Sequence, residues 1–380
     1  MTGIQTTLIH GADSIYERVS DVVPPINVST TFKYPQKVEE LIPVDDQSID
    51  SIAGSGNFIY SRLSHPNSEA LELTFKKLFG KDVVVYSSGL AAFNAILFHY
   101  SPKRIFIDHC YAGCHGIVNL FKRFGLKEFG VSEEELKENL SQGDLIHIET
   151  PVNPEGTSYD IEYFTKIAHE RGAYVSVDST FAPFPLQDPF LFEADIVMHS
   201  ATKYYGGHSD LLSGLLVVKD DKIKAELVFD RVYLGTNIGN LESYLLIRSL
   251  RTFKMRIEVQ SKNCEKLVKY LNDNKEGKFS KVIDKIYHSS LQKEEFVARQ
   301  LPNGYGPVFS IDLVSEDFAK RLAANLKYFQ HATSLGGVES LIEWRALSAP
   351  KIRRTLVRIS VGCEEIEDLI EDIEQGLLSL

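Results

Sequence analysis

The chain has 380 residues, of which 43% are hydrophobic, so it is long enough for a substantial core and for roughly two or three domains. Its 41 basic and 52 acidic residues give a net charge of -11, which argues against nucleic acid or another polyanion as a partner. No apolar run reaches membrane-spanning length, and Met1–His10 lacks the features of a secretory signal, so we expect a soluble, cytoplasmic protein with no membrane partner.

The pattern of predicted elements divides the chain into three segments. Residues 1–58 are expected to form an irregular arm for subunit contact, which includes a polar, mobile loop over Asp45–Asn57. Residues 59–240 alternate strand and helix signals, which predicts a doubly wound α/β domain with a mostly parallel sheet. Residues 241–380 are expected to form a long connecting helix, to about Leu271, and a smaller C-terminal α/β domain.

The first strand signal of the second segment leads into a turn that is suited to an anion. The run Val83–Tyr86 continues through Ser87, Ser88 and Gly89 into a helical stretch over Leu90–Phe98. The first amides of a helix have no partner within the helix, so they are free to bind a negatively charged group. This strand-turn-helix unit therefore predicts a phosphate-binding turn.

The next strand signals are followed by side chains that suit an aromatic ligand. Tyr111 comes soon after the run Arg104–Asp108 and offers a ring for stacking. Asn153 lies in the turn that follows the run Ile146–Glu149. A later β-rich run ends on the carboxylate of Asp178, which suits a cationic ring nitrogen.

A lysine follows the apolar run Ile196–Met198, which predicts a buried parallel strand. The C-terminal end of such a strand is where open α/β sheets place their ligands. Lys203 is flanked by the hydroxyls of Ser200 and Thr202, which can reach a phosphate, and by Gly206–Gly207, which allow a close approach of the backbone to a ligand. Lysine, ring-facing carboxylate, phosphate turn and stacking tyrosine together specify pyridoxal 5'-phosphate (PLP) as the cofactor.

Further motifs occur along nearly the whole chain, at residues 6–11, 24–32, 60–62, 87–92, 149–154, 177–181, 199–210, 334–341 and 358–362. In this order they resemble the Cys/Met-metabolism (trans-sulfuration) family of PLP-dependent enzymes, which includes cystathionine γ-lyase, γ-synthase and β-lyase. The resemblance implies the α/β fold of PLP-dependent transferases, known as fold type I. It also implies a homo-oligomer, with a dimer of dimers as the expected form.

The resemblance assigns roles around the cofactor. It implies that Lys203 holds PLP covalently and later moves protons, that Asp178 pairs with the ring nitrogen, and that Tyr111 stacks on the ring. Asn153 is implied to contact the ring hydroxyl. The residues implied to hold the phosphate are Ser88, Gly89, Leu90, Ser200 and Thr202, together with Tyr60 and Arg62 from a neighbouring subunit.

The resemblance also implies how an amino-acid substrate is held. Arg358, supported by Ser334 and Asn153, is implied to grip the substrate α-carboxylate, and Glu339 to contact a cystathionine-type substrate. A physical check agrees, because strand alternation places Arg358 on the face opposite to its apolar neighbours. No metal site is predicted, because the histidines and cysteines of His109–His115 lack the usual ligand spacing.

The reaction is narrowed but not fixed by these motifs. Glu339 and Gly206–Asp210 favour γ-elimination or γ-replacement on cystathionine or an activated homoserine. Ile59, which stands where cystathionine enzymes often carry an acid, and the short segment Ile342–Val357 depart from that pattern. Methionine γ-lyase, cystathionine β-lyase and O-acylhomoserine sulfhydrylase activities are therefore alternatives. A weakly active PLP-binding homologue with a regulatory role is an alternative of another class, which the full catalytic set disfavours.

Overall fold

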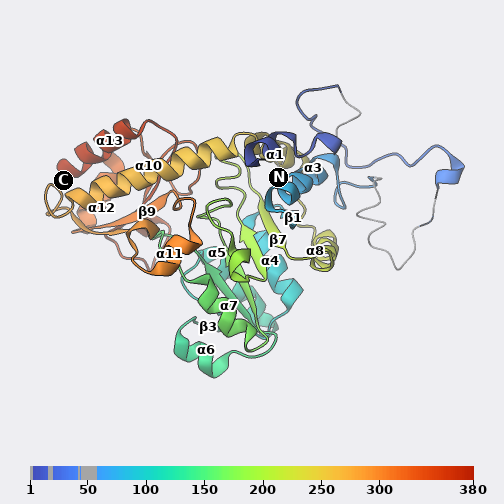
Figure 1. Cartoon of the computed structure of the whole chain (residues 1–380), viewed down its shortest axis with the longest axis horizontal. Coiled ribbons are helices and arrows are strands. Elements are labelled where there is room, and N and C mark those ends of the chain that lie inside the picture. The colour runs from blue at the N-terminus through green and yellow to red at the C-terminus, as the bar shows by residue number, and fades with distance from the viewer. Residues whose placement is uncertain (1–2, 16–19, 42, 44–57) are drawn as a thin grey trace.

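The structure is a computed structural model that describes residues 3–15, 20–41, 43 and 58–380. The predicted loop over Asp45–Asn57 lies outside the described residues. The described chain builds a seven-stranded sheet and a five-stranded sheet. In Figure 1 the first lies in the lower, green part of the molecule and the second in the orange part on the left.

The predicted N-terminal arm is partly regular. Its first residues form helix α1 (Ile4–His10), which buries Leu8 and packs on helix α3 (Pro66–Phe79). Residues 20–32 run along the body, where Asn27 bonds to Asn67 of α3 and to Asn240, whereas residues 33–41 reach away from the body, as Figure 1 shows on the right. Both stretches expose apolar side chains, such as Val22 and Val38, to solvent in the single chain. This part of the arm is therefore available for contact with another chain.

The seven-stranded sheet has the order β1-β7-β6-β5-β4-β2-β3. Strand β7 pairs antiparallel with β1 and β6, and the other neighbours pair parallel, which confirms the predicted mostly parallel sheet. Its strands are β1 (Asp82–Tyr86), β2 (Arg104–Ile107), β3 (Lys127–Phe129), β4 (Leu145–Glu149), β5 (Tyr174–Asp178), β6 (Ile196–His199) and β7 (Gly214–Val218). Its helices are α4 (Gly89–Tyr100), α5 (Ala112–Phe121), α6 (Glu133–Asn139), α7 (Ile161–His169) and α8 (Asp221–Leu234).

The apolar runs of this sheet arise because both of its faces are covered. In β1, Val83 and Val85 pack into one core, while Val84 and Tyr86 pack into a second core. Successive side chains of a strand point to opposite faces, so a strand with a core on each side must be apolar throughout. The strand ends are then the positions at which polar residues reach a ligand.

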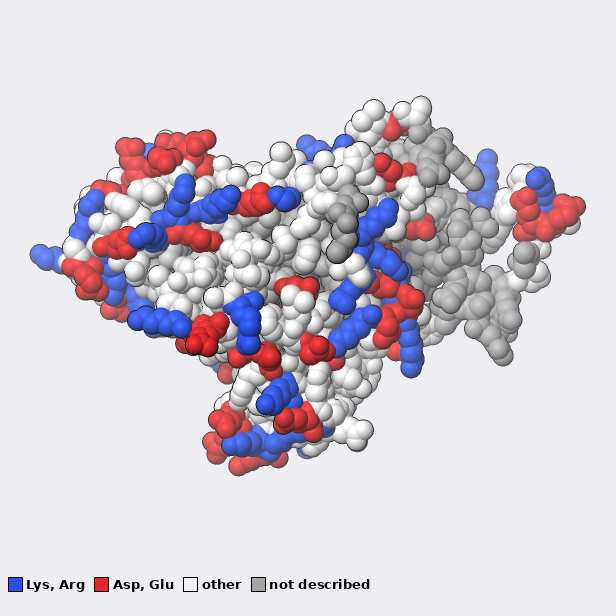
Figure 2. All heavy atoms as spheres, viewed as in Figure 1, with Lys and Arg blue, Asp and Glu red and all other residues white. Residues whose placement is uncertain are grey.

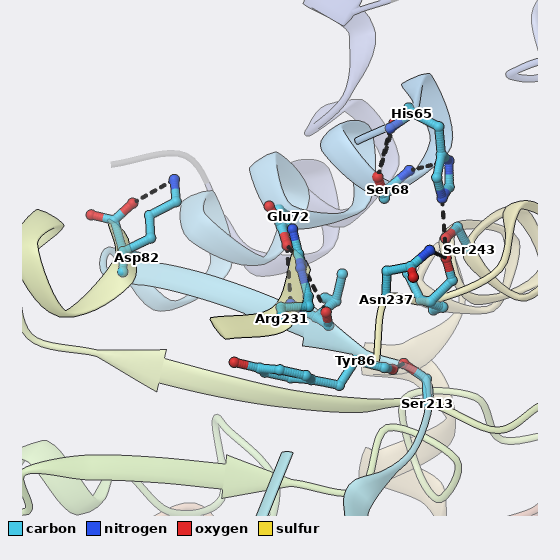
Figure 3. Close-up of polar contacts among 12 residues, drawn as sticks. His65, Ser68, Glu72, Asp82, Tyr86, Ser213, Arg231, Asn237 and Ser243 are labelled. Atoms are coloured by element: carbon cyan, nitrogen blue, oxygen red, sulfur yellow. Dashed lines mark hydrogen bonds and ion pairs between the residues drawn. The ribbon is translucent and has the colours of Figure 1, made fainter. Parts of the chain in front are cut away.

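Side chains close the outer edge of β1 (Figure 3). The backbone N–H of Val85 donates to Glu72 Oε1 of α3 over 3.0 Å. Arg231 Nη1 of α8 donates to the carbonyl oxygen of Val85 over 2.8 Å and to the same Glu72 oxygen over 2.5 Å. Arg231 is buried, so its bonds to Glu72 and to the strand edge are both shielded from water. Both backbone groups of Val85 are thereby satisfied without another strand.

The predicted single helix from Leu241 to Leu271 is wrong, because two helices occupy this stretch. Helix α9 (Asn240–Leu250) ends before Thr252, and helix α10 (Phe253–Asn274) follows. The Arg256 side chain stabilises the break by donating to the Ser249 carbonyl over 2.9 Å and to Thr252 Oγ1 over 3.2 Å. The apolar pattern runs across the break because both helices pack against the same core.

The five-stranded sheet has the order β10-β11-β12-β9-β8. Helix α10 reaches it from the first sheet, as Figure 1 shows, and packs on helix α13. The apolar residues of α13 (Ile366–Leu378) recur on one face of the helix, and Leu369, Ile373 and Leu377 are buried in the core. The strands are β8 (Ile283–Tyr287), β9 (Val308–Leu313), β10 (Gln330–His331), β11 (Leu341–Trp344) and β12 (Leu356–Ser360), and the helices are α11 (Glu295–Gln300), α12 (Glu316–Asn325) and α13 (Ile366–Leu378).

The charged surface mixes both signs. Figure 2 shows Lys and Arg side chains interspersed with Asp and Glu on this face of the molecule. Along α10, Lys254 pairs with Glu258 and Lys269 pairs with Asp273. Charges of both signs therefore lie side by side on this face. No helix within the described ranges has both the length and the apolar character needed to cross a membrane.

Candidate active site

The predicted phosphate-binding turn is present between β1 and α4. Ser88 is the N-cap of α4, and its Oγ accepts a hydrogen bond from the Ala91 amide over 3.1 Å. The Gly89 and Leu90 amides have no acceptor in the described part of the chain. A Cβ atom on Gly89 would lie 3.1 Å from the Cβ of Ser200, so the turn packs directly against that residue. Free amides and a nearby hydroxyl thus form a cradle for an anion.

Thr202 lies beside this cradle, but its hydroxyl is engaged elsewhere. Thr202 Oγ1 donates to the carbonyl oxygen of Ser213 over 3.2 Å and accepts from the Ser213 amide over 3.0 Å. Ser213 Oγ in turn donates to the carbonyl oxygen of Tyr86, at the end of β1 (Figure 3). These hydrogen bonds connect the segment that carries Lys203 to the end of β1.

Lys203 follows β6, as predicted, and its ammonium group is close to the C-terminal part of the chain. Lys203 Nζ donates to Ser334 Oγ over 2.7 Å. Burial, reinforced by the positive charge of Arg358, lowers the pKa of Lys203 to about 8. Ser334 has a positive φ of 83°, an uncommon conformation for a residue with a side chain. A neutral amine is thus accessible to Lys203 near physiological pH.

Asp178 ends β5 and is almost completely buried. Its Oδ1 accepts from the Thr180 amide over 3.0 Å and from the Thr180 hydroxyl over 2.5 Å, while Oδ2 has no hydrogen-bond partner among the described residues. Burial raises the pKa of Asp178 to about 6, although the bonds from Thr180 oppose this shift. A buried carboxylate with one free oxygen fits a cationic ring nitrogen.

Glu149 is a site residue to which sequence reasoning gave no role. It ends β4, and its two oxygens accept the amides of Tyr111, over 2.7 Å, and Asn153, over 2.9 Å. Burial and the charge of Asp178 raise the pKa of Glu149. A Cβ atom on Gly113 would lie 2.5 Å from Cε1 of the half-exposed Tyr111 ring, so the ring packs closely on this glycine. Glu149 thus fixes the backbone beside two predicted cofactor contacts.

The three residues predicted to hold the substrate α-carboxylate lie together. Arg358 Nη1 donates to Asn153 Oδ1 over 3.0 Å, and its Nη2 donates to the carbonyl oxygen of Ser334 over 2.8 Å. Nη2 also forms a 2.7 Å ion pair with Glu343, a residue that no sequence motif pointed to. Glu343 lies opposite Arg358 in the pairing of β11 with β12. Burial, with the charge of Arg345, lowers the pKa of Arg358 to about 10.

The structure of one chain does not bring Tyr60, Arg62 or Glu339 into this group. Arg62 Nη1 donates to the carbonyl oxygen of Val232 over 2.9 Å, and its guanidinium lies 5.7 Å from the centre of the Tyr60 ring. Glu339 accepts a hydrogen bond from Ser209. Among the described contacts, none of the three forms a hydrogen bond or ion pair with the lysine segment at Ser200 and Lys203.

The glycine pair after Lys203 serves the protein itself, contrary to the prediction of a close ligand approach. Gly207 has a positive φ, and a Cβ atom there would lie 1.8 Å from Arg256 Nη1. Arg256 uses this space to donate to the Tyr204 carbonyl over 2.7 Å. His208 Nδ1 bonds to the Gly206 carbonyl over 2.8 Å, which stabilises this turn.

The residues present fit PLP. The free oxygen of Asp178 suits the ring nitrogen. The lowered pKa of Lys203 suits reaction of its amine with the aldehyde. The free amides of Gly89 and Leu90 suit the phosphate. All four cysteines are free thiols. No group of three or more His, Cys, Asp or Glu side chains in the described ranges is placed to hold a metal ion.

Comparisons with known proteins identify the family of the chain. The family model described as Cys/Met metabolism PLP-dependent enzyme matches residues 5–378. The chain is 33% identical to the cystathionine beta-lyase of Lactococcus lactis subsp. cremoris, over 99% of each chain. It is also 33% identical to the cystathionine gamma-lyase of Bacillus subtilis, over 98% of each chain.

A solved structure also confirms the predicted fold type. The cystathionine gamma-lyase from Lactobacillus plantarum, complexed with L-serine, has a TM-score of 0.87 and 28% identity, and the alignment covers 100% of this chain and 99% of that one. The family match extends over nearly the whole chain, including every strand of both sheets. The chain therefore belongs to the Cys/Met metabolism family of PLP-dependent enzymes, which carry out the carbon-sulfur chemistry of trans-sulfuration.

Proposed function

We propose that the chain catalyses γ-elimination or γ-replacement on cystathionine or an activated homoserine, with Lys203 as the acid-base residue. The observation that carries this proposal is the position of Lys203. Its Nζ lies 2.7 Å from Ser334 Oγ, and its pKa is lowered to about 8 by burial and by Arg358. A base must be neutral to accept a proton, so this pKa suits proton transfer near neutral pH.

Each remaining residue of the proposed site has a separate task. When bound, PLP supplies an electron sink that stabilises negative charge at the carbons of an attached amino acid. Asp178 would hold the ring nitrogen, the Ser88–Leu90 turn and Ser200 the phosphate, and Tyr111 the face of the ring. Arg358 would bind the α-carboxylate, which orients the Cα proton toward Lys203. Lys203 would then take that proton, and a later proton removal at the β-carbon would allow a γ-substituent to leave.

A product assay tests the reaction. Cystathionine, methionine and cysteine would each be offered alone, and O-acylhomoserine together with cysteine. With uptake of one water, γ-elimination of cystathionine releases cysteine, ammonia and a four-carbon keto acid, whereas β-elimination releases homocysteine, ammonia and pyruvate. Lys203→Ala is the control and should lose turnover while the fold, measured by circular dichroism, stays intact. Full activity of this variant would refute the role of Lys203, and β-elimination products would favour the cystathionine β-lyase alternative.

We also propose that the site is completed by a neighbouring subunit in a homo-oligomer, with a dimer of dimers as the expected form. The support is that Tyr60 and Arg62 are exposed and lie apart from the cradle in their own chain, next to an arm that reaches away from the body. Arg62→Ala and Lys203→Ala, each inactive alone, should regain activity in mixed oligomers. No recovery after verified subunit mixing would show that the site is built from one chain.

A cytoplasmic location and the boundaries 1–58, 59–240 and 241–380 remain predictions.

A further inference from the structure

A buried cluster of charges lies at the end of β11 and on the short segment between β11 and β12, beside Arg358, which is proposed to bind the substrate α-carboxylate. Glu343 is almost fully buried, and its Oε2 lies 2.7 Å from Arg345 Nη1 and 2.7 Å from Arg358 Nη2. Its other oxygen accepts from Ser348 Oγ over 2.5 Å. One carboxylate therefore faces two guanidinium groups, and one positive charge remains without a counter-charge in the cluster.

Arg345 has an unfilled hydrogen-bonding group within this cluster. Its side chain is only 12% exposed, and its Nε is buried with no partner among the described residues. A buried N–H without an acceptor costs free energy, and a charged donor costs more than a neutral one. The excess positive charge matches the substrate α-carboxylate proposed for Arg358, and the free Nε donor of Arg345 points to a further acceptor that is not part of the chain.

The position of Arg345 relates this acceptor to the substrate. Arg358 and Arg345 contact the same oxygen of Glu343, so the two guanidinium groups are neighbours. The pKa of Arg358 is lowered by burial and by the charge of Arg345, as expected at close range. Arg358 also contacts Asn153 and the Ser334 carbonyl. A molecule with one carboxylate on Arg358 can therefore place a second anionic group next to Arg345.

We propose that Arg345 is a specificity-determining residue that binds a second carboxylate of the substrate. The site then favours amino acids whose side chain ends in a carboxylate over those whose side chain ends in a neutral group. This inference rests on the proposed function, because it places the substrate α-carboxylate on Arg358. A guanidinium suits this task because its planar fork can bind a carboxylate through two parallel hydrogen bonds.

Binding of unreactive dicarboxylates tests the proposal without turnover. The cofactor-loaded full chain would be titrated with succinate, glutarate and adipate, and with butyrate, valerate and hexanoate as monocarboxylates of matched length. Trp344, the only tryptophan of the chain, is adjacent to Arg345 and reports binding by fluorescence. At least one dicarboxylate should bind roughly 10- to 100-fold more tightly than its matched monocarboxylate, the range expected for a hydrogen bond to a charged group.

Variants on the same segment separate recognition from folding. Arg345→Gln should abolish the preference for dicarboxylates, and Arg345→Lys, which keeps a charge for Glu343, should reduce it. Arg354→Gln is the matched control, since the Arg354 side chain is 72% exposed, and it should keep the full preference. If Arg345→Gln does not fold, Arg345→Lys decides the question. An unchanged preference in Arg345→Lys, or in a folded Arg345→Gln, would overturn the proposal.

Kinetics then connect binding with substrate choice. The ratio of kcat/KM for cystathionine to kcat/KM for methionine should fall in Arg345→Gln by about the factor lost in dicarboxylate binding, mainly through KM. A wild-type chain that turns over no amino acid, yet binds dicarboxylates through Arg345, would refute the proposed function and support only the binding of a second carboxylate by Arg345. A wild-type chain that is active but binds both ligand series equally would refute the inference alone.

Discussion

Replacing Glu343 by glutamine should destabilise the five-stranded sheet strongly. The change keeps the shape of the side chain but leaves the guanidinium groups of Arg345 and Arg358 buried without a carboxylate, where two 2.7 Å ion pairs now meet. Removing one partner of a buried ion pair typically costs about 3–5 kcal/mol of unfolding free energy. The Arg358 side chain, at 4% exposed, has no access to water that could offset this cost. Loss of the Glu343 charge should also lower the pKa of Arg358 further.

Urea unfolding followed by Trp344 fluorescence measures this effect, because Trp344 ends β11, one residue after Glu343. The matched control is Glu316→Gln, which removes a carboxylate that pairs with the exposed Arg354 and Lys320. Solvent screens the control pairs, so its unfolding midpoint should hardly move. Equal midpoints for Glu343→Gln and Glu316→Gln would show that the buried cluster does not hold the sheet together.

Three further predictions concern the proposed cofactor site. In cofactor-free protein, acylation of Lys203 should reach half its maximal rate near pH 8 instead of near 10.5, because only the neutral amine reacts; a midpoint near 10.5 would contradict its burial. PLP affinity, measured by equilibrium dialysis, should fall as the pH drops through about 6 and Asp178 becomes protonated, and Asp178→Asn should remove this pH dependence. Gly113→Ala should weaken PLP binding by displacing the Tyr111 ring. Gly116→Ala on the same helix is the control and should leave PLP binding unchanged, because a Cβ atom there meets nothing within 4 Å. Equal PLP affinities of the two variants would show that the position of the ring is unimportant.

Residues at the ends of apolar runs could be predicted from sequence because their placement is local. Asp178 ends one β-rich run and Lys203 comes soon after another, and the parallel sheet brings the ends of these strands to one side. The pairing of Arg358 with Asn153 and Ser334 came from the family resemblance and not from spacing. Its agreement with the structure shows that the two sheets meet at this point.

Features that depend on long-range contacts could not be predicted in the same way. Glu343 reads as an ordinary strand residue until the register of β11 with β12 places it opposite Arg358. The glycine pair suggested a ligand, but the space at Gly207 is filled by Arg256 from α10, which lies far along the chain. The break before Thr252 was hidden because the helices on both sides bury apolar residues in one core.

The closed edge of β1 limits how subunits can assemble. A strand with free backbone groups invites a strand from another chain, so an open edge leads either to extended sheets or to aggregation. Here Glu72 and Arg231 occupy the amide and the carbonyl of Val85, and a foreign strand would have to displace a buried ion pair to reach them. Oligomers of this chain should therefore not form by strand addition to β1 at Val85, and an internal deletion of α8 should expose this edge and promote aggregation through β1.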